Sequence, residues 1–315
     1  MGLQSKITYA FVVSVLILTA ESFGKQDEID KKTEPLVGYH EAFIFGLVEG
    51  VTEFLPISST GHLILTNEWM LDPSNLQEKE KNAINAYLIV IQVGAIFAVA
   101  LLYCRRIIAI LMGFLGLDPG GKKLGINILL AFAPAVALGP LLDESIEALL
   151  FGAIPVSLAL ILGALLMHWA ENRKKSQDGL NGDAGKKLED LSWKNALMIG
   201  LLQCVAMCPG TSRSMMTIVG GYFAGLSRRN AAEFSFLLGL VTLTAAAVYK
   251  ALTQGRALID NLALGPMFFG CLVAGLSAAL SVRWLVGYLG RHGLGLFVWY
   301  RFILGILILV YCLAG

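Results

Sequence analysis

Residues 46–62 have the sequence GLVEGVTEFLPISSTGH, an apolar helical run that carries two glutamates and is interrupted at Pro56. Proline removes a helical hydrogen bond, and the small residues that follow it loosen the helix further. In a membrane, such irregular backbone persists only where protein or a wet cavity satisfies its polar groups. The stretch 41–70 therefore predicts a re-entrant hairpin, whose two helices enter and leave the bilayer on one side.

The composition of the 315-residue chain is that of a membrane protein. Hydrophobic residues make up 56% and charged residues 15%, and the mean hydropathy is +0.70. Soluble domains carry roughly 25% charged residues. The formal charge of +1 excludes a protein that coats nucleic acid. Five cysteines without a C-x-x-C pair indicate neither a disulfide scaffold nor a zinc site.

Six apolar stretches have the length of about 20 residues that a spanning helix needs. They are 84–104, 124–142, 151–170, 230–250, 264–286 and 296–314. A polar connector, 171–192, follows the third stretch, and a second interrupted stretch, 195–226, precedes the fourth. We therefore expect an all-α polytopic membrane protein.

The two halves of the chain, 38–170 and 193–315, each combine one re-entrant hairpin with three spans. An offset of 154 aligns Ser58 with Ser212. An odd number of crossings gives the halves opposite orientations, a common way to build a site at the membrane midplane. Lysines and arginines mark the cytoplasmic links, so the first hairpin opens outside and the second inside. We predict two inverted repeats.

Residues 1–37 precede the first repeat. An apolar run at 7–20 and a polar linker fit either a signal-like segment or one extra hydrophobic span. Both alternatives place the linker outside.

Glu49 and Glu53 lie one helical turn apart, so they share a face of the first arm. A carboxylate in hydrocarbon costs about 2.5–3.5 kcal/mol, and two neighbours also repel each other. We therefore expect positive charge beside them. The alternatives are a structural pair that an arginine neutralises or that stays protonated, and a site for a divalent cation, since Mg²⁺ and Ca²⁺ prefer carboxylate oxygens.

The hydroxyls of Ser58, Ser59 and Thr60 follow at the turn, and His62 opens the second arm. Alone, these residues would be helix caps and a hydrogen-bonded core histidine. Beside paired carboxylates, a hydroxyl or imidazole nucleophile forms a plausible catalytic set.

The second hairpin supplies the opposite charge. Residues 209–214 have the sequence PGTSRS, and Thr217 follows. Free N–H groups at a helix start, the Arg213 guanidinium and the hydroxyls of Ser212, Ser214 and Thr217 suit a phosphate. The alternative is an arginine that snorkels to the interface. A phosphate would be repelled by the glutamates, so a bridging divalent cation is the expected cofactor.

The two motifs, at 46–62 and 209–214, closely resemble those of the undecaprenyl-diphosphate phosphatases of the bacitracin-resistance family, from about residue 38 to the C-terminus. The resemblance implies hydrolysis of a C55 isoprenoid diphosphate to the monophosphate carrier lipid of cell-wall synthesis. It also implies a divalent cation and two inverted repeats, each a hairpin plus three spans. The implied location is the bacterial inner membrane, with the site reached from the periplasmic side.

The resemblance also implies residue roles. These are metal binding and catalysis for Glu49 and Glu53, phosphate contact with nucleophilic or acid–base work for Ser58, Ser59 and His62, and phosphate binding for Ser212, Arg213 and Thr217. Cys208 and Met215 depart from the family pattern. We expect the Met215 thioether to narrow the loop against the phosphate.

The expected partners are a polyprenyl diphosphate and membrane lipids, without nucleic acid. The oligomeric state stays open, a homodimer included. A lipid flippase or transporter is the alternative function, because broken helices in inverted repeats are a transporter architecture. Release of phosphate would favour the phosphatase, whereas lipid flux in liposomes without phosphate release would favour the flippase or transporter. An intramembrane serine protease lacks a supporting serine–histidine geometry.

Overall fold

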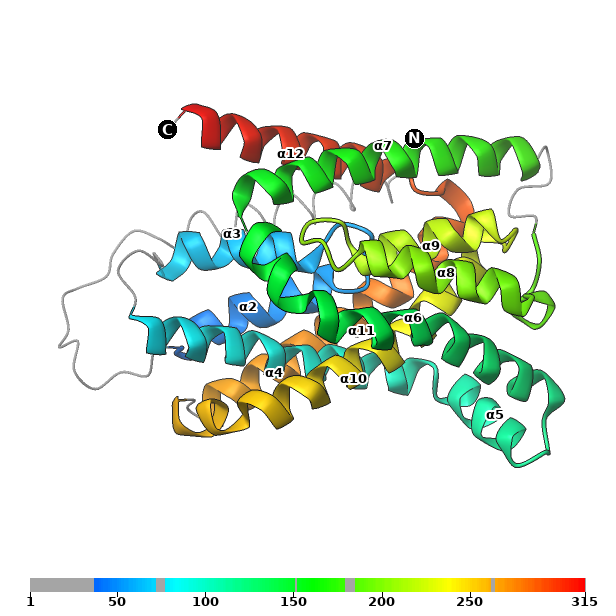
Figure 1. Ribbon diagram of the computed structural model, residues 1–315, viewed down its shortest axis with the longest axis horizontal. Helices are drawn as coiled ribbons and strands as arrows, with labels where there is room; N and C mark the ends of the chain where they lie inside the picture. The colour runs from blue at the N-terminus through cyan, green and yellow to red at the C-terminus, as the bar shows by residue number, and fades with distance from the viewer. Residues whose placement is uncertain (1–36, 72–76, 151, 179–184, 262–263, 315) are drawn as a thin grey trace. The chain divides into compact units, whose positions relative to one another are not determined.

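The computed structural model describes residues 37–71, 77–150, 152–178, 185–261 and 264–314, and these fold into α-helices joined by short turns. The helices are α2 (Tyr39–Thr52), α3 (Ser59–Leu71), α4 (Glu78–Leu102), α5 (Cys104–Phe114), α6 (Pro119–Leu150), α7 (Ala153–Asp178), α8 (Trp193–Val205), α9 (Arg213–Phe223), α10 (Arg228–Asn261), α11 (Leu264–His292) and α12 (Gly295–Ala314), with a 3-10 turn, η3 (Leu188–Asp190), before α8 (Figure 1). The predicted segment 1–37 lies outside the described residues except for its last position.

Helices long and apolar enough to cross a membrane lie where the sequence predicts spans. Within the described residues they are Ile84–Leu102, Pro119–Leu142, Ala153–Gln177, Arg228–Leu252, Leu264–His292 and Gly295–Leu313. The chain is therefore an all-α polytopic membrane protein, as predicted. The orientation of the two halves in a bilayer stays a prediction.

Two segments differ from the predicted layout. The link after the first span contains α5, whose sequence CRRIIAILMGF sets apolar side chains at helical spacing. The third span continues to Asp178, so the first residues of the predicted polar connector are helical. Charged side chains tolerate helix well, and Lys175 in the last turn favours the negative end of the helix dipole.

Each predicted hairpin is two helices separated by a short bend. The first bend, 53–58, joins α2 to α3, and the second bend, 206–212, joins α8 to α9. Each bend ends at a serine with positive φ, Ser58 at 75° and Ser212 at 73°. These are the positive-φ residues other than glycine in the part of the chain that the structure describes. They are separated by the offset of the predicted repeat.

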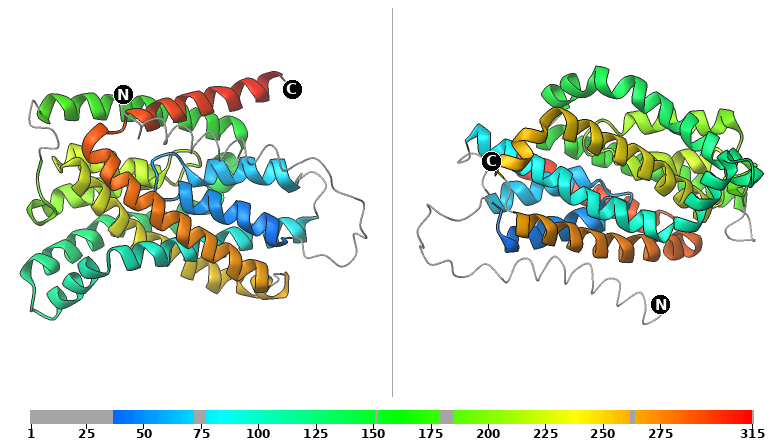
Figure 2. Two further views of the ribbon diagram at one scale, coloured as in Figure 1. Left: turned by 180° about the vertical axis from the view of Figure 1, so that it is seen from behind. Right: turned by 90° about the horizontal axis from the view of Figure 1, so that it is seen from below.

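The hairpins approach each other from opposite sides, and their bends meet between the long helices, as the two opposite views agree (Figures 1 and 2). Close helix packing holds them there: α2 packs along α11, and α8 packs along α6. A Cβ at Gly50 would collide with the Ala274 carbonyl oxygen, and one at Gly200 with that of Ala131. Such small residues let helices approach in membrane proteins. The packing thus brings the two broken segments to one place.

Candidate active site between the two bends

A cavity of about 210 Å³ lies between the bends. Both bends contribute polar side chains to its wall, while α4 and α10 contribute one residue each. Its lining is Glu53, Ser58, Ser59, Thr60, Gln92, Ala206, Met207, Cys208, Pro209, Gly210, Ser212, Arg213 and Leu243. Polar groups from segments about 150 residues apart in sequence therefore face one small space, the usual form of a ligand site.

An ion pair joins the acidic bend to the basic one. Arg213 Nη2 donates to Glu53 Oε1 at 3.0 Å, and the two side chains are only 11% and 5% exposed. Pairing satisfies two charges that would each be unfavourable alone at this depth. The opposite charges of the two hairpins therefore meet, as the charge argument predicts.

The position of the Arg213 guanidinium is fixed from several directions. Its Nη1 donates to the Ser235 carbonyl at 3.1 Å, and its Cζ lies 5.3 Å from the centre of the Phe54 ring. A Cβ at Gly239 of α10 would collide with the guanidinium, so this glycine makes room for it. Arg213 Nε has no hydrogen-bond partner among the described residues. A guanidinium held in this way on the cavity wall suits an anion.

Ser59 and Glu53 have the geometry that a nucleophile and its base require. The Ser59 hydroxyl donates to Glu53 Oε2 at 2.5 Å, and both residues line the cavity. A hydroxyl is a weak nucleophile until a base within hydrogen-bond reach takes its proton. Of the hydroxyls that the sequence singles out, Ser59 therefore has the geometry for attack.

Glu49 is a buried carboxylate just behind the cavity wall. It is 1% exposed, does not line the cavity, and interacts with the side chain of Gln92, which does. No group of three or more His, Cys, Asp or Glu side chains suited to a metal occurs in the described ranges. Magnesium at phosphate sites commonly takes one or two carboxylates, with phosphate oxygens and water as the other ligands. Glu49 and Glu53 fit such a cation.

His62 lies behind the first bend and does not line the cavity. Its Nδ1 is 2.6 Å from the Ser58 carbonyl oxygen, and its Nε2 is 2.6 Å from the Tyr300 hydroxyl. Because a carbonyl oxygen only accepts, Nδ1 carries the proton, and Nε2 of the neutral ring accepts from Tyr300. Both nitrogens are thus engaged in holding the bend.

The predicted phosphate ligands divide into two groups. Ser58, Ser59, Thr60, Ser212 and Arg213 line the cavity. Ser212 also accepts from the Met215 backbone N–H at 3.3 Å and so caps α9. The first group is where the sequence predicts it.

The second group points into the protein. Ser214 donates to the Leu55 carbonyl at 2.6 Å, and Thr217 donates to the Arg213 carbonyl at 2.9 Å. Both side chains are fully buried and lie outside the cavity lining. The expectation for Met215 is wrong, because its thioether is buried in the core toward Gly163 rather than against the cavity. Successive residues of a helix point about 100° apart, so Ser214 turns away from the space that Arg213 lines, and Thr217 lies one turn further along α9 from the bend.

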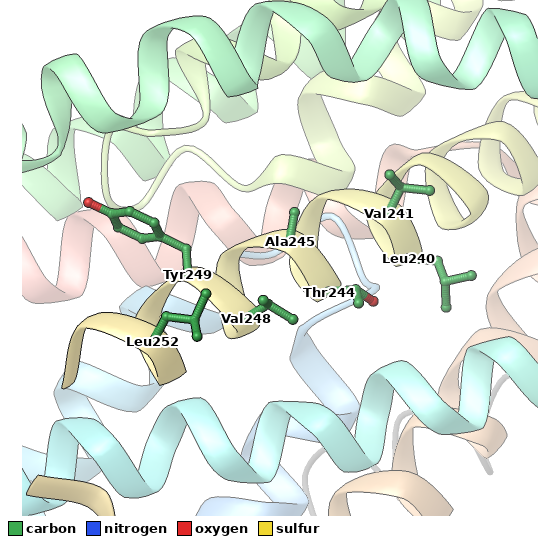
Figure 3. A pocket seen from close by; sticks show the side chains of 7 residues that line it. All are labelled: Leu240, Val241, Thr244, Ala245, Val248, Tyr249 and Leu252. Atoms are coloured by element: carbon green, nitrogen blue, oxygen red, sulfur yellow. The ribbon is translucent and has the colours of Figure 1, made fainter. Parts of the chain in front are cut away.

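An apolar groove of about 640 Å³ runs along α10. Figure 3 shows its side chains along one face of the helix, and they are Leu240, Val241, Thr244, Ala245, Val248, Tyr249 and Leu252. Leu243 of α10 belongs to the cavity wall, and at about 100° per residue it lies on the other side of the helix from this row. The same helix therefore contributes one face to the apolar groove and a different face to the polar cavity.

A family model for the bacitracin resistance protein BacA matches residues 42–307. The chain belongs to this family. The undecaprenyl-diphosphatase 2 of Rhodospirillum rubrum is 45% identical over 280 residues, which cover 89% of this chain and 97% of the relative. The undecaprenyl-diphosphatase of Acinetobacter baumannii (strain AYE) is 43% identical over 272 residues, covering 86% and 94%. The undecaprenyl-diphosphatase 2 of Shewanella oneidensis is 39% identical over 273 residues, covering 87% and 98%.

In this member of the bacitracin resistance family, sequence reasoning missed several residues of the site. Gln92 lines the cavity from α4, although a glutamine in a span is first expected to bond a neighbouring helix. Cys208 lies on the wall as well, so this departure from the family pattern changes the cavity surface. The signal for Gln92 was available, since polar residues inside a span mark sites.

Proposed function

We propose that the chain is a membrane phosphatase that hydrolyses undecaprenyl diphosphate to undecaprenyl phosphate and inorganic phosphate. The observation that carries this proposal is the chain of contacts Ser59–Glu53–Arg213 on the cavity wall. It sets a nucleophile, its base and an anion-binding cation side by side. The names of relatives at 39–45% identity support the same activity.

The proposed reaction begins with the terminal phosphate against Arg213. The Ser59 oxygen attacks the terminal phosphorus, its proton passes to Glu53, and the bond from that phosphorus to the bridging oxygen breaks. Undecaprenyl phosphate leaves with the bridging oxygen. Water then attacks the phosphoserine, Glu53 returns the proton to Ser59, and inorganic phosphate is released. Arg213 stabilises the charge on the phosphoryl oxygens throughout.

Glu49 and Glu53 are the proposed ligands of a divalent cation, Mg²⁺ or Ca²⁺. When bound, this ion supplies positive charge to phosphate oxygens that two carboxylates would otherwise repel. The burial of Glu49 one helical turn from Glu53, beside Gln92 of the cavity wall, supports this assignment.

The apolar groove on α10 is the proposed path of the polyprenyl chain. Its seven lining residues are apolar apart from the hydroxyls of Thr244 and Tyr249, and the other side of the same helix contributes Leu243 to the cavity wall. A polyprenyl tail contributes only apolar area, so an apolar face on a helix of the head-group site suits it.

The proposed location is the bacterial inner membrane, with the cavity reached from the periplasmic side. There the enzyme would recycle the carrier lipid of peptidoglycan synthesis and confer bacitracin resistance. The predicted orientation of the first hairpin supports this side, and a homodimer stays a prediction.

The test uses purified protein in detergent and undecaprenyl diphosphate labelled with ³²P in its terminal phosphate. We expect phosphate release with Mg²⁺ or Ca²⁺, none with EDTA, and label trapped on Ser59 after an acid quench. Ser59→Ala should abolish both signals, while Ser176→Ala, at an exposed serine of α7, should change neither. Lipid flux in liposomes without phosphate release would favour the flippase alternative instead.

A further inference from the structure

Arg301 is a fully buried arginine in the first half of α12, with an exposed fraction of 0%. It forms no ion pair with a carboxylate in the described part of the chain, and its guanidinium instead donates to backbone carbonyls. Nη2 lies 3.0 Å from the Gly210 oxygen and 3.1 Å from that of Ala159, and Nη1 lies 3.5 Å from that of Pro56. One side chain thus reaches both bends and α7.

The two bend carbonyls occupy equivalent places. Pro56 and Gly210 are separated by the repeat offset, and each precedes a positive-φ serine by two residues. Arg301 therefore holds the same point of both bends, from the side away from the cavity, whose wall does not include it. Its donors act where each chain turns toward the cavity.

Packing alone does not account for this arginine. A buried cation without a carboxylate is unfavourable, and an apolar side chain of similar size is usually at least as stable. The fold also leaves room for it, since a Cβ at Gly163 of α7 would collide with Nη2. The planar fork of an arginine, unlike an ammonium group, can serve separate acceptors in fixed directions.

We propose that Arg301 is a positioning residue that ties the two bends together, so that Ser59 and Glu53 of one meet Arg213 of the other. The inference rests on the proposed phosphatase function for its kinetic consequences. The contact of Arg301 with both bends can also be tested without substrate, by hydrogen exchange.

The kinetic test compares Arg301→Met and Arg301→Lys with the unaltered protein. Misplacing reacting groups by about 1 Å costs roughly 100-fold in rate. We therefore expect kcat of Arg301→Met to fall about 100-fold, with KM changed less than about threefold, because the groups that hold the substrate remain. Arg301→Lys keeps the charge but loses the fork, and we expect an intermediate kcat. Arg283→Met, at an exposed arginine of α11, is the matched control and should behave as the unaltered protein.

The structural test is hydrogen exchange of the backbone amides, which does not depend on turnover. Arg301→Met should speed exchange in both bends, 53–58 and 206–212, and leave the middle of α10 unchanged. Should the unaltered protein release no phosphate, the proposed function fails while this measurement still decides the tie. Unchanged exchange in either bend overturns the proposal, and so does an unchanged kcat in an active enzyme.

Gly163→Ala provides a second route if Arg301→Met does not fold. The added methyl displaces the guanidinium without removing it, so kcat should fall and exchange should rise in both bends. Gly287→Ala is the control, because a Cβ there meets nothing within 4 Å, and it should change neither kcat nor exchange. Normal kcat and normal exchange in Gly163→Ala would overturn the proposal.

Discussion

The two bends have similar backbone conformations but carry opposite charges. Both turn through a positive-φ serine, and the helix that follows begins at Ser59 in the first and at Arg213 in the second. These two residues are related by the repeat offset, so equivalent positions hold a nucleophile and a cation. Two identical bends would offer two of one and none of the other. Two repeated bends can therefore form a phosphate site only if their side chains differ at equivalent positions.

The bends also differ in how they are anchored. His62, which is itself hydrogen-bonded to Tyr300, holds the Ser58 carbonyl, whereas Met216 occupies the place of His62 in the second hairpin and is buried. A serine caps the following helix in both bends, since Ser58 accepts from the Gly61 N–H at 3.4 Å and Ser212 from the Met215 N–H at 3.3 Å. The nucleophile side therefore has a hydrogen-bonded side chain in addition to the cap, whereas the anion side has the cap and packing.

The largest expected effect comes from erasing the charge difference. Arg213→Gln should lower kcat/KM at least about 1000-fold, because transition-state charge loses its fixed cation. Arg213→Lys should recover part of this, since it keeps the charge without the fork. The measurement is phosphate release from undecaprenyl diphosphate, with Arg291→Gln at the exposed end of α11 as the control. Activity of Arg213→Gln within tenfold of normal would remove Arg213 from the site.

Glu49→Gln makes the first arm resemble the second, where Gln203 stands at the equivalent position. Loss of a ligand charge should raise the Mg²⁺ or Ca²⁺ concentration for half-maximal activity about 10- to 100-fold. The metal dependence of phosphate release after EDTA treatment measures this. Glu68→Gln, at an exposed glutamate of α3, should leave the dependence unchanged. An unaltered metal requirement in Glu49→Gln would rule out this carboxylate as a ligand.

Gly239→Ala perturbs only the basic bend. The methyl group would push the Arg213 guanidinium from its position between Glu53 and Ser235, and kcat should fall roughly 10- to 100-fold. Gly287→Ala is the matched control, because a Cβ there meets nothing within 4 Å. Equal activities of the two variants would show that the position of the guanidinium does not limit turnover.

Tyr300→Phe perturbs only the acidic bend. It removes the donor to His62 Nε2 and keeps the ring stacked on His62, whose centre lies 5.6 Å away. We expect a three- to tenfold lower kcat and a loss of about 1 kcal/mol in the free energy of unfolding, the usual worth of one hydrogen bond. Thermal unfolding in detergent and phosphate release measure the two. Tyr311→Phe, at an exposed tyrosine of α12, should change neither.

The sequence predicts the spans and both hairpins because apolar length and proline or glycine interruptions are local signals. It also predicts the meeting of Glu53 with Arg213, since unpaired charges at membrane depth need partners. It does not predict that Ser214 and Thr217 turn inward, because that depends on how α9 is rotated against its neighbours.

The anchoring role of α12 is equally hidden in the sequence. Tyr300 has the pattern of an interfacial aromatic residue. The acceptors of Arg301 are carbonyls up to 245 residues away, and every residue has a carbonyl. The sequence shows only that a single arginine lies inside an apolar helix. That signal indicates a functional position but does not identify the groups that the arginine contacts.

Since main-chain oxygens receive the hydrogen bonds of Arg301, no single codon change in either loop can delete an acceptor. This contact therefore places no demand of its own on side-chain identity in the two bends, provided that the path of the chain is preserved. Selection for this contact falls on α12, far along the gene from the residues whose geometry it sets.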